Sequence, residues 1–181
     1  RMGNLTMKRY YGASATLDQI GVFIIGGAGQ NNGRTSEFLA AGTMEWQEGP
    51  DLPMFMYSQC AVQISPTSFL AIEETYIREF DAAIAGPTSS EGWRDIDRWP
   101  AMKTRRIKQP GCAKIGQKVI IAGGFNEGSL RSTEVLDLVN RQITSGWQHQ
   151  MATPRKWFHI ATIAVRGKEQ MFALAGHDRS H

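Results

Sequence analysis

The chain has 181 residues, of which 41% are hydrophobic and 20% charged, and its formal net charge is +3. This composition is typical of a globular domain and argues against a disordered chain. No apolar run approaches 18 residues, which predicts no membrane span. The weak net charge also disfavours a nucleic-acid surface, which is usually more basic and interleaved with exposed aromatic residues.

The first part of the chain predicts four short strands and no helix. Small residues at positions 12–17 suit an inner strand, because strands crowd where they converge. The apolar run at 22–25 is too short for a helix and ends in Gly26-Gly27, where the backbone can turn sharply. The four strands are expected at residues 12–17, 22–27, 36–40 and 44–47, before Gly49-Pro50-Asp51 ends regular structure.

This pattern recurs along the chain with a period close to 50 residues. The repeats begin at Leu5, Leu52, Met102 and Met151, in steps of 47, 50 and 49 residues. A glycine column, an arginine column and a tryptophan column keep the same order in each unit, which is the signature of a repeat architecture. The glycine column holds Gly26, Glu73, Gly123 and Ala175, the arginine column holds Arg9, Met56, Arg106 and Arg155, and the tryptophans are Trp46, Trp93 and Trp147.

The repeats differ in how well they keep the pattern. The third repeat, residues 102–148, is the most regular. The second repeat replaces the glycine pair by Glu73-Glu74 and the arginine by Met56, and it carries a loop at residues 85–92. Since carboxylate side chains poorly replace residues with positive φ, its turn is the least certain to be kept. The last repeat supplies two strands, at residues 159–165 and 171–174.

The repeated unit resembles a kelch repeat, with Arg106, Gly123-Gly124, the strand at residues 134–137 and Trp147 in the order of that family. The resemblance implies an all-β protein, a β-propeller of kelch type whose unit is a four-stranded antiparallel blade. Three complete blades are expected at about residues 5–47, 52–94 and 102–148, with a half blade at 151–176. Kelch-like rings commonly have six or seven blades, so the resemblance further implies that this chain is an excerpt whose remaining blades are missing from it.

The family resemblance also implies a binding role. In such a blade the loop between the second and third strands shares a rim with the connection to the next blade, and kelch-like propellers typically present this rim to a protein or peptide, often an acidic one. Arg106 and the neighbouring Arg105 are the first candidates, since a guanidinium suits a carboxylate. The column arginines have an alternative role, in which they hold the loops by bonding backbone carbonyls. The remaining candidates are Arg155, Arg9, Arg34, Asn126, Arg131, Tyr10, Tyr57 and Trp157.

Catalytic chemistry is disfavoured. The resemblance also allows an alternative, in which the chain is part of a propeller enzyme that acts on a carbohydrate, of the copper oxidase or sugar isomerase type. No suitably spaced His, Tyr and Cys set is present for the oxidase. His177 and His181 flank Asp178 at the end of the chain, where a metal pair is not favoured. The sequence therefore predicts a non-enzymatic module with no catalytic residue, no metal and no cofactor.

The two cysteines, Cys60 and Cys112, are expected as buried free thiols, with a disulfide as the alternative. So few cysteines favour a reducing compartment such as the cytoplasm. The glycosylation-type triplet Asn4-Leu5-Thr6 leaves secretion open.

Overall fold

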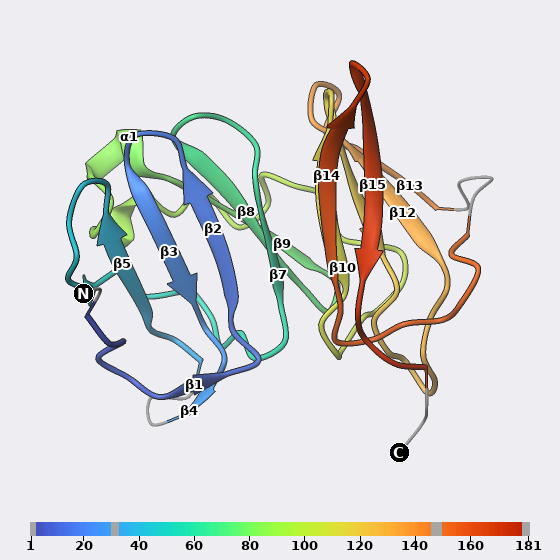
Figure 1. The fold of residues 1–181 in the computed structure, drawn as a ribbon, viewed down its shortest axis with the longest axis horizontal. Coiled ribbons are helices and arrows are strands. Elements are labelled where there is room, and N and C mark those ends of the chain that lie inside the picture. Colours follow the sequence, from blue (N-terminus) through green and yellow to red (C-terminus); the bar gives the residue numbers. More distant parts are fainter. Residues whose placement is uncertain (1–2, 30–32, 146–149, 179–181) are drawn as a thin grey trace. The chain divides into compact units, whose positions relative to one another are not determined.

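A computed structural model of the chain describes residues 3–29, 33–145 and 150–178 (Figure 1). It is all-β, with 46% of residues in strands and 4% in helices, and none of its antiparallel sheets closes into a barrel. The all-β prediction is therefore confirmed, while the assignment of these sheets to a kelch-type propeller stays a prediction. The chain divides into two compact units, one of Arg1–Ile72 with Arg78–Arg98 and the other of Glu73–Ile77 with Trp99–His181.

The first unit contains a four-stranded sheet, here called the first sheet. Its inner strand alternates buried and exposed residues, with Ala13, Ala15 and Leu17 buried. The two alanines suit a strand that lies beside the inner strand of the next sheet, β7 (Figure 1). The strand order is β2 (Ala13–Leu17), β3 (Gly21–Ile25), β5 (Ser36–Ala40) and β6 (Gln47–Glu48).

The second sheet has three strands where four were predicted. The fourth is reduced to an isolated bridge between Phe80 and Trp93. The predicted loop after the third strand contains a short helix, α1 (Ala82–Ala85), and one 3-10 turn, η1 (Ser90–Gly92). The strands are β7 (Cys60–Gln63), β8 (Ser68–Glu73) and β9 (Tyr76–Asp81).

Aromatic rings from the first and second sheets form the core of the first unit. Phe23 and Phe38 of the first sheet lie 4.7 Å apart between ring centroids, and Phe69 and Phe80 of the second lie 5.4 Å apart. Phe23 also lies 5.4 Å from Phe69, and Trp93 packs edge-on against Phe80 at 5.3 Å. Each such pair stabilises the fold by about 0.5–1.5 kcal/mol beyond the contribution of its buried surface. Trp93 thus packs as core, Trp46 is half-buried, and Trp147 lies outside the described residues.

The second unit contains a four-stranded and a two-stranded sheet, the third and fourth sheets. Val119, Ile120, Ile121 and Ala122 are all buried, as predicted for a strand covered on both faces. The inner strands β10 and β14 lie side by side. The third sheet is β10 (Gly111–Ile115), β11 (Lys118–Ala122), β12 (Thr133–Asp137) and β13 (Gln142–Ser145), and the fourth is β14 (His159–Val165) and β15 (Lys168–Leu174).

The turns after the second strands lie against the segments that lead to the next sheet. The backbone N–H of Gly27 donates to the Met56 carbonyl at 2.9 Å, and that of Gly124 donates to the Arg155 carbonyl at 2.8 Å. Glu74 makes the same bond to Arg106 at 3.2 Å. The predicted shared edge of these two kinds of connection is therefore confirmed at each of these three turns. A short ladder of β1 (Arg9–Tyr10) with β4 (Ala28–Gly29) belongs to the same edge.

The turns keep a left-handed residue even where glycine is replaced. Gly26 and Gly123 have φ of 58° and 62°, and Ala175, in the same column, has φ of 61°. In the second repeat the left-handed residue is Glu74, with φ of 52°. A non-glycine residue in this region costs about 1–3 kcal/mol, so the tertiary structure holds these two turns in place.

The cysteine prediction needs a correction. Cys60 and Cys112 are buried as predicted, but neither is a free thiol.

Among the described residues, no helix combines the length and the apolar character that crossing a membrane requires.

Candidate binding surface

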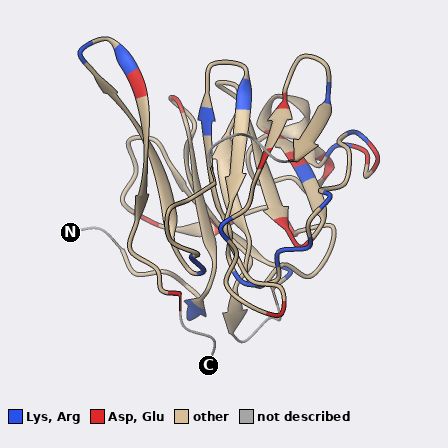
Figure 2. Ribbon diagram, turned by 90° about the vertical axis from the view of Figure 1, so that its right-hand side faces the viewer, with Lys and Arg blue, Asp and Glu red and all other residues tan. Residues whose placement is uncertain are grey.

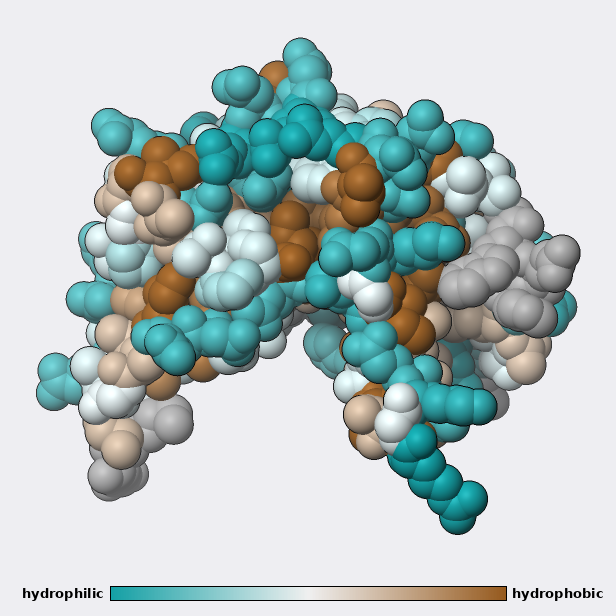
Figure 3. Space-filling view, turned by 90° about the horizontal axis from the view of Figure 1, so that it is seen from above, coloured by the Kyte–Doolittle hydropathy of each residue, from teal (hydrophilic) through white to brown (hydrophobic). Residues whose placement is uncertain are grey.

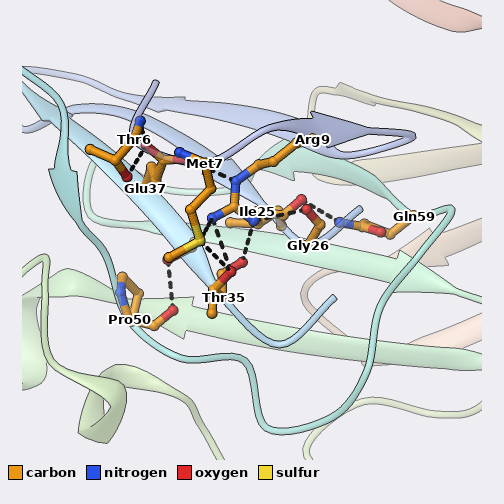
Figure 4. Close-up of polar contacts among 10 residues, drawn as sticks. Thr6, Met7, Arg9, Ile25, Gly26, Thr35, Glu37, Pro50 and Gln59 are labelled. Carbon is orange, nitrogen blue, oxygen red and sulfur yellow. Dashed lines mark hydrogen bonds and ion pairs between the residues drawn. The ribbon is translucent and has the colours of Figure 1, made fainter. Parts of the chain in front are cut away.

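Arg9 lies inside the first unit, where it connects three segments (Figure 4). Its Nε donates to Oε1 of Glu37 at 3.0 Å, and its Nη1 donates to the carbonyls of Gly26 at 3.1 Å and Thr35 at 2.9 Å. The side chain of Glu37 is fully buried and also accepts bonds from the N–H and hydroxyl of Thr6, at 2.6 and 2.7 Å. Burial raises the pKa of Glu37, but the bonds from Thr6 and Arg9 outweigh it, so the net pKa is lowered.

Arg106 makes the same set of contacts in the second unit. It is fully buried, and its Nη1 donates to the carbonyls of Gly123 at 2.6 Å and Ser132 at 3.1 Å. Its Nη2 donates to Oε1 of the buried Glu134 at 3.2 Å. Burial lowers the pKa of Arg106, and the neighbouring Glu134 partly offsets this. Arg9 and Arg106 thus have the loop-holding role that the sequence allowed as the alternative, and their guanidinium groups are not at the surface.

The second repeat keeps the carboxylate but takes its cation from elsewhere. Met56, in the arginine column, is fully buried. Glu79, whose side chain is 5% exposed, pairs instead with Nε of Arg98. Phe38 of the first sheet and Phe80 of the second sheet point into one core that lies between these sheets. Successive side chains of a strand point to opposite faces, so Glu37 and Glu79, each one residue earlier, point away from that core. The arginine-column position of this repeat, held by Met56, therefore does not lie on the same face as Glu79.

Exposed aromatic side chains gather on the loops of the first unit. The guanidinium of Arg34 lies 5.5 Å from the ring centroid of Phe55, and Phe55 stacks on Tyr57 with centroids 6.2 Å apart and planes 6° apart. Tyr10 is 60% exposed and contacts Tyr11 edge-on at 5.1 Å. The sequence identified Arg34, Tyr10 and Tyr57 as candidates but not Phe55 and Tyr11, which lie within two residues of Tyr57 and Tyr10.

The predicted side chains of the second unit are exposed in part and already make contacts. Arg105 forms a two-point pair with Glu74, at 3.1 and 3.2 Å, on the surface. Arg131 donates from Nε to the Met151 carbonyl at 3.0 Å. Asn126 is exposed in the turn between β11 and β12. These contacts tie the loops together and leave the outer faces of the side chains toward solvent.

Two lysines and two aromatic rings form a cluster at the same edge of the second unit, here called the lysine–aromatic cluster: Lys108, Phe125, Lys156 and Trp157. The Nζ of Lys108 lies 4.2 Å from the Phe125 ring centroid and 5.4 Å from that of Trp157. The Nζ of Lys156 lies 4.7 and 5.0 Å from the same two centroids. Trp157 has φ of 54°, a left-handed conformation, and its ring also contacts His177 at 4.9 Å.

Apart from the two aromatic rings, Lys156 has no partner for its charge among the described residues. It is fully buried, and its Nζ makes no hydrogen bond. Burial and then the nearby Lys108 lower the pKa of Lys156. In the described part of the chain neither lysine forms an ion pair with an acidic side chain.

Lys156 was missed in the sequence, although a signal was present. It follows the column arginine, a position that holds Tyr10, Tyr57 and Ile107 in the other repeats. A cation at a position otherwise held by large apolar or aromatic residues marks this repeat as different. Only Trp157, its neighbour, was among the predicted candidates.

No metal centre is found within the described ranges, where no group of three or more His, Cys, Asp or Glu residues is suitably placed. His177 packs on Trp157, and His181 lies outside the described residues. No protein-family model matches this chain, and no curated protein is detectably similar to it. The kelch assignment consequently rests on the internal repeats alone.

Proposed function

We propose that this protein is a non-enzymatic binding module for a protein or peptide, and that the lysine–aromatic cluster receives an acidic group of that partner. The observation that carries the proposal is the buried Nζ of Lys156, which has no hydrogen-bond acceptor. An unpaired buried ammonium is costly, and an arriving carboxylate would offset that cost.

The surroundings of Lys156 suit a carboxylate on a polypeptide. Lys108 supplies a second positive charge, and Phe125 and Trp157 supply apolar contact area beside it. Aromatic and cationic side chains of this kind dominate the energetics of many protein interfaces. All four residues come from connections between strands, where binding residues are usually found on a rigid scaffold. The resemblance of the repeats to kelch units supports the same class of function.

A pair of fluorescent peptides tests the proposal. The first contains two glutamates flanked by alanine and tyrosine, and the second replaces both glutamates by glutamine. Fluorescence anisotropy should show binding of the glutamate peptide that weakens with salt, since Lys108 is only half-buried and dissolved ions screen its charge. The Lys156→Met variant should lose this binding, while Lys103→Met, which removes an equal charge from an exposed position, should keep it. Equal binding of the two peptides, or unchanged binding by Lys156→Met, would reject the proposal.

A further inference from the structure

The triplet Asn4-Leu5-Thr6 lies in an exposed stretch of the first unit that belongs to no strand or helix. Among the described residues, no hydrogen bond holds the side chain of Asn4. Residues 3–7 carry no charge, so the ribbon beyond the grey start of the chain is tan in Figure 2. Asparagine followed two residues later by threonine, with no proline between them, is the acceptor pattern for N-linked glycans on surface loops.

The backbone is fixed on both sides of Asn4. The Gly3 N–H donates to the carbonyl of Met44, in the connection between β5 and β6, at 2.7 Å. The N–H and the hydroxyl of Thr6 donate to Oε2 of Glu37 at 2.6 and 2.7 Å. From there the chain continues to β1, which pairs with β4 (Figure 1). Asn4 therefore lies at the end of the first sheet where β5 ends, opposite the turn that joins β3 to β5.

The surface beside Asn4 has room for a bulky group and is partly apolar. Gly3 lies against Met44, which lines a hollow of about 420 Å³ together with Trp46. Leu5 and Met44 are 36% and 59% exposed, and apolar side chains that reach the surface appear tan to brown in Figure 3. A hydrophilic glycan at this position would shield these apolar groups from contact with other molecules.

The state of the cysteines is an independent indication of the compartment. Cys60 and Cys112 are both disulfide-bonded. Disulfides form and persist in oxidising compartments such as the lumen of the endoplasmic reticulum, where N-linked glycans are also added. The small number of cysteines favoured a reducing compartment, but their bonded state indicates an oxidising one. The triplet and the cysteines thus agree on a compartment in which Asn4 would meet the glycosylating enzyme.

We propose that Asn4 is a site of N-linked glycosylation, with an oligosaccharide carried on a lipid diphosphate as the donor. Nδ2 of Asn4 forms a bond to the anomeric carbon of the first sugar. The bond from that carbon to the diphosphate oxygen breaks, and the amide loses one proton as the lipid diphosphate leaves. Because the Thr6 hydroxyl is bonded to Glu37 in the folded protein, the enzyme reaches the triplet before the first sheet forms.

The position of Asn4 keeps a glycan away from the exposed aromatic loops of the first unit. Arg34 lies in the connection between β3 and β5, and its carbonyl accepts a bond from the N–H of Leu52, in the segment that leads to Phe55. These loops are at the opposite end of the first sheet from Met44. The glycan would thus cover one end of this sheet and leave the other open. This site does not rest on the proposed binding function.

Secretion of the 181-residue chain from cultured animal cells tests the proposal. Intact mass should show one N-linked glycan, and peptide N-glycosidase should remove it and convert Asn4 to aspartate. Asn4→Gln should lack the glycan, and Asn140→Gln, an equal change at an exposed asparagine outside any such triplet, should keep it. Secreted and cell-associated protein are both analysed, so that slow secretion does not hide the result.

Thermal unfolding tests whether the fold accommodates the glycan. The glycosylated and the enzymatically deglycosylated proteins should melt within about 2 °C of each other, because changes at exposed positions without buried contacts affect stability little. The proposal is overturned if Asn4 carries no glycan in either protein fraction. It is also overturned if the glycan lowers the melting temperature by more than this, because Asn4 would then be covered in the folded protein.

Discussion

The first and third repeats neutralise the buried glutamate of the third strand in the same way, and the second repeat neutralises it differently. In the first and third, a buried glutamate is neutralised by the column arginine, which also holds two backbone carbonyls. In the second, Met56 fills the arginine position with apolar volume and Arg98 supplies the cation from beyond the sheet. All three repeats thus pair the buried carboxylate with an arginine. Which arginine forms the pair depends on the face of the sheet from which the glutamate projects.

The largest effect is expected for Arg106→Met. Removing one partner of a buried pair leaves an uncompensated charge, here on Glu134, and takes the guanidinium donor from the Gly123 carbonyl, which should lower the free energy of unfolding by about 3–5 kcal/mol. Urea unfolding measures this change. The matched control is Arg105→Met, whose pair with Glu74 has side chains 56% and 37% exposed and should contribute less than about 1 kcal/mol. Similar losses in both variants would contradict a structural role specific to Arg106.

A smaller loss is expected for Arg98→Met in the second repeat. Its side chain is 29% exposed, so water screens part of the charge that remains on Glu79, and we expect a loss of about 1–2 kcal/mol in urea unfolding. Adding Met56→Arg should not restore stability, since position 56 belongs to the face that Glu79 does not occupy. A full rescue by that second substitution would show that the two faces are not distinct.

The smallest effect is a pH dependence that comes from Glu37. Its pKa is lowered in the folded protein from an ordinary value of 4.5. The associated stability is therefore complete above about pH 4.5 and is lost as the pH falls through the folded pKa. Unfolding free energy measured from pH 6 downward should fall more steeply in the original protein than in Glu37→Gln. Parallel curves for the two proteins would mean that Glu37 does not titrate in this way.

Each apolar run before a turn became a second strand, because a short apolar run suits a strand covered on both faces. The outer strands were predicted less well, since 44–47 was expected and β6 is Gln47–Glu48. The shared edge of the loops was predicted from the blade that the resemblance implies, in which successive strands alternate in direction. The sequence did not distinguish a buried arginine from an exposed one, because Arg105 and Arg106 are adjacent and identical in type. Only the third dimension shows that Arg106 points inward to Glu134 while Arg105 lies on the surface.

Glu79 occupies the same place in its repeat as Glu37 and Glu134, one residue into the third strand in β5 and β12 and three residues into it in β9, although Glu79 projects from the other face of its sheet. A shift of one residue in register exchanges the two faces of a strand, and a column of identical residue types does not reveal it. The partner of Glu79 was consequently missed. Lys156 was missed for a different reason, since its unpaired charge is apparent only once its burial is known.

The backbone bonds between each turn and the segment entering the next sheet have a consequence for cooperativity. The amides of Gly27, Glu74 and Gly124 are released only if the residues leading to the following sheet move away. Within each unit, neighbouring sheets should therefore open as a pair and not one strand at a time, as in other stacked repeats. Loosening one entry segment would then be felt across the whole unit.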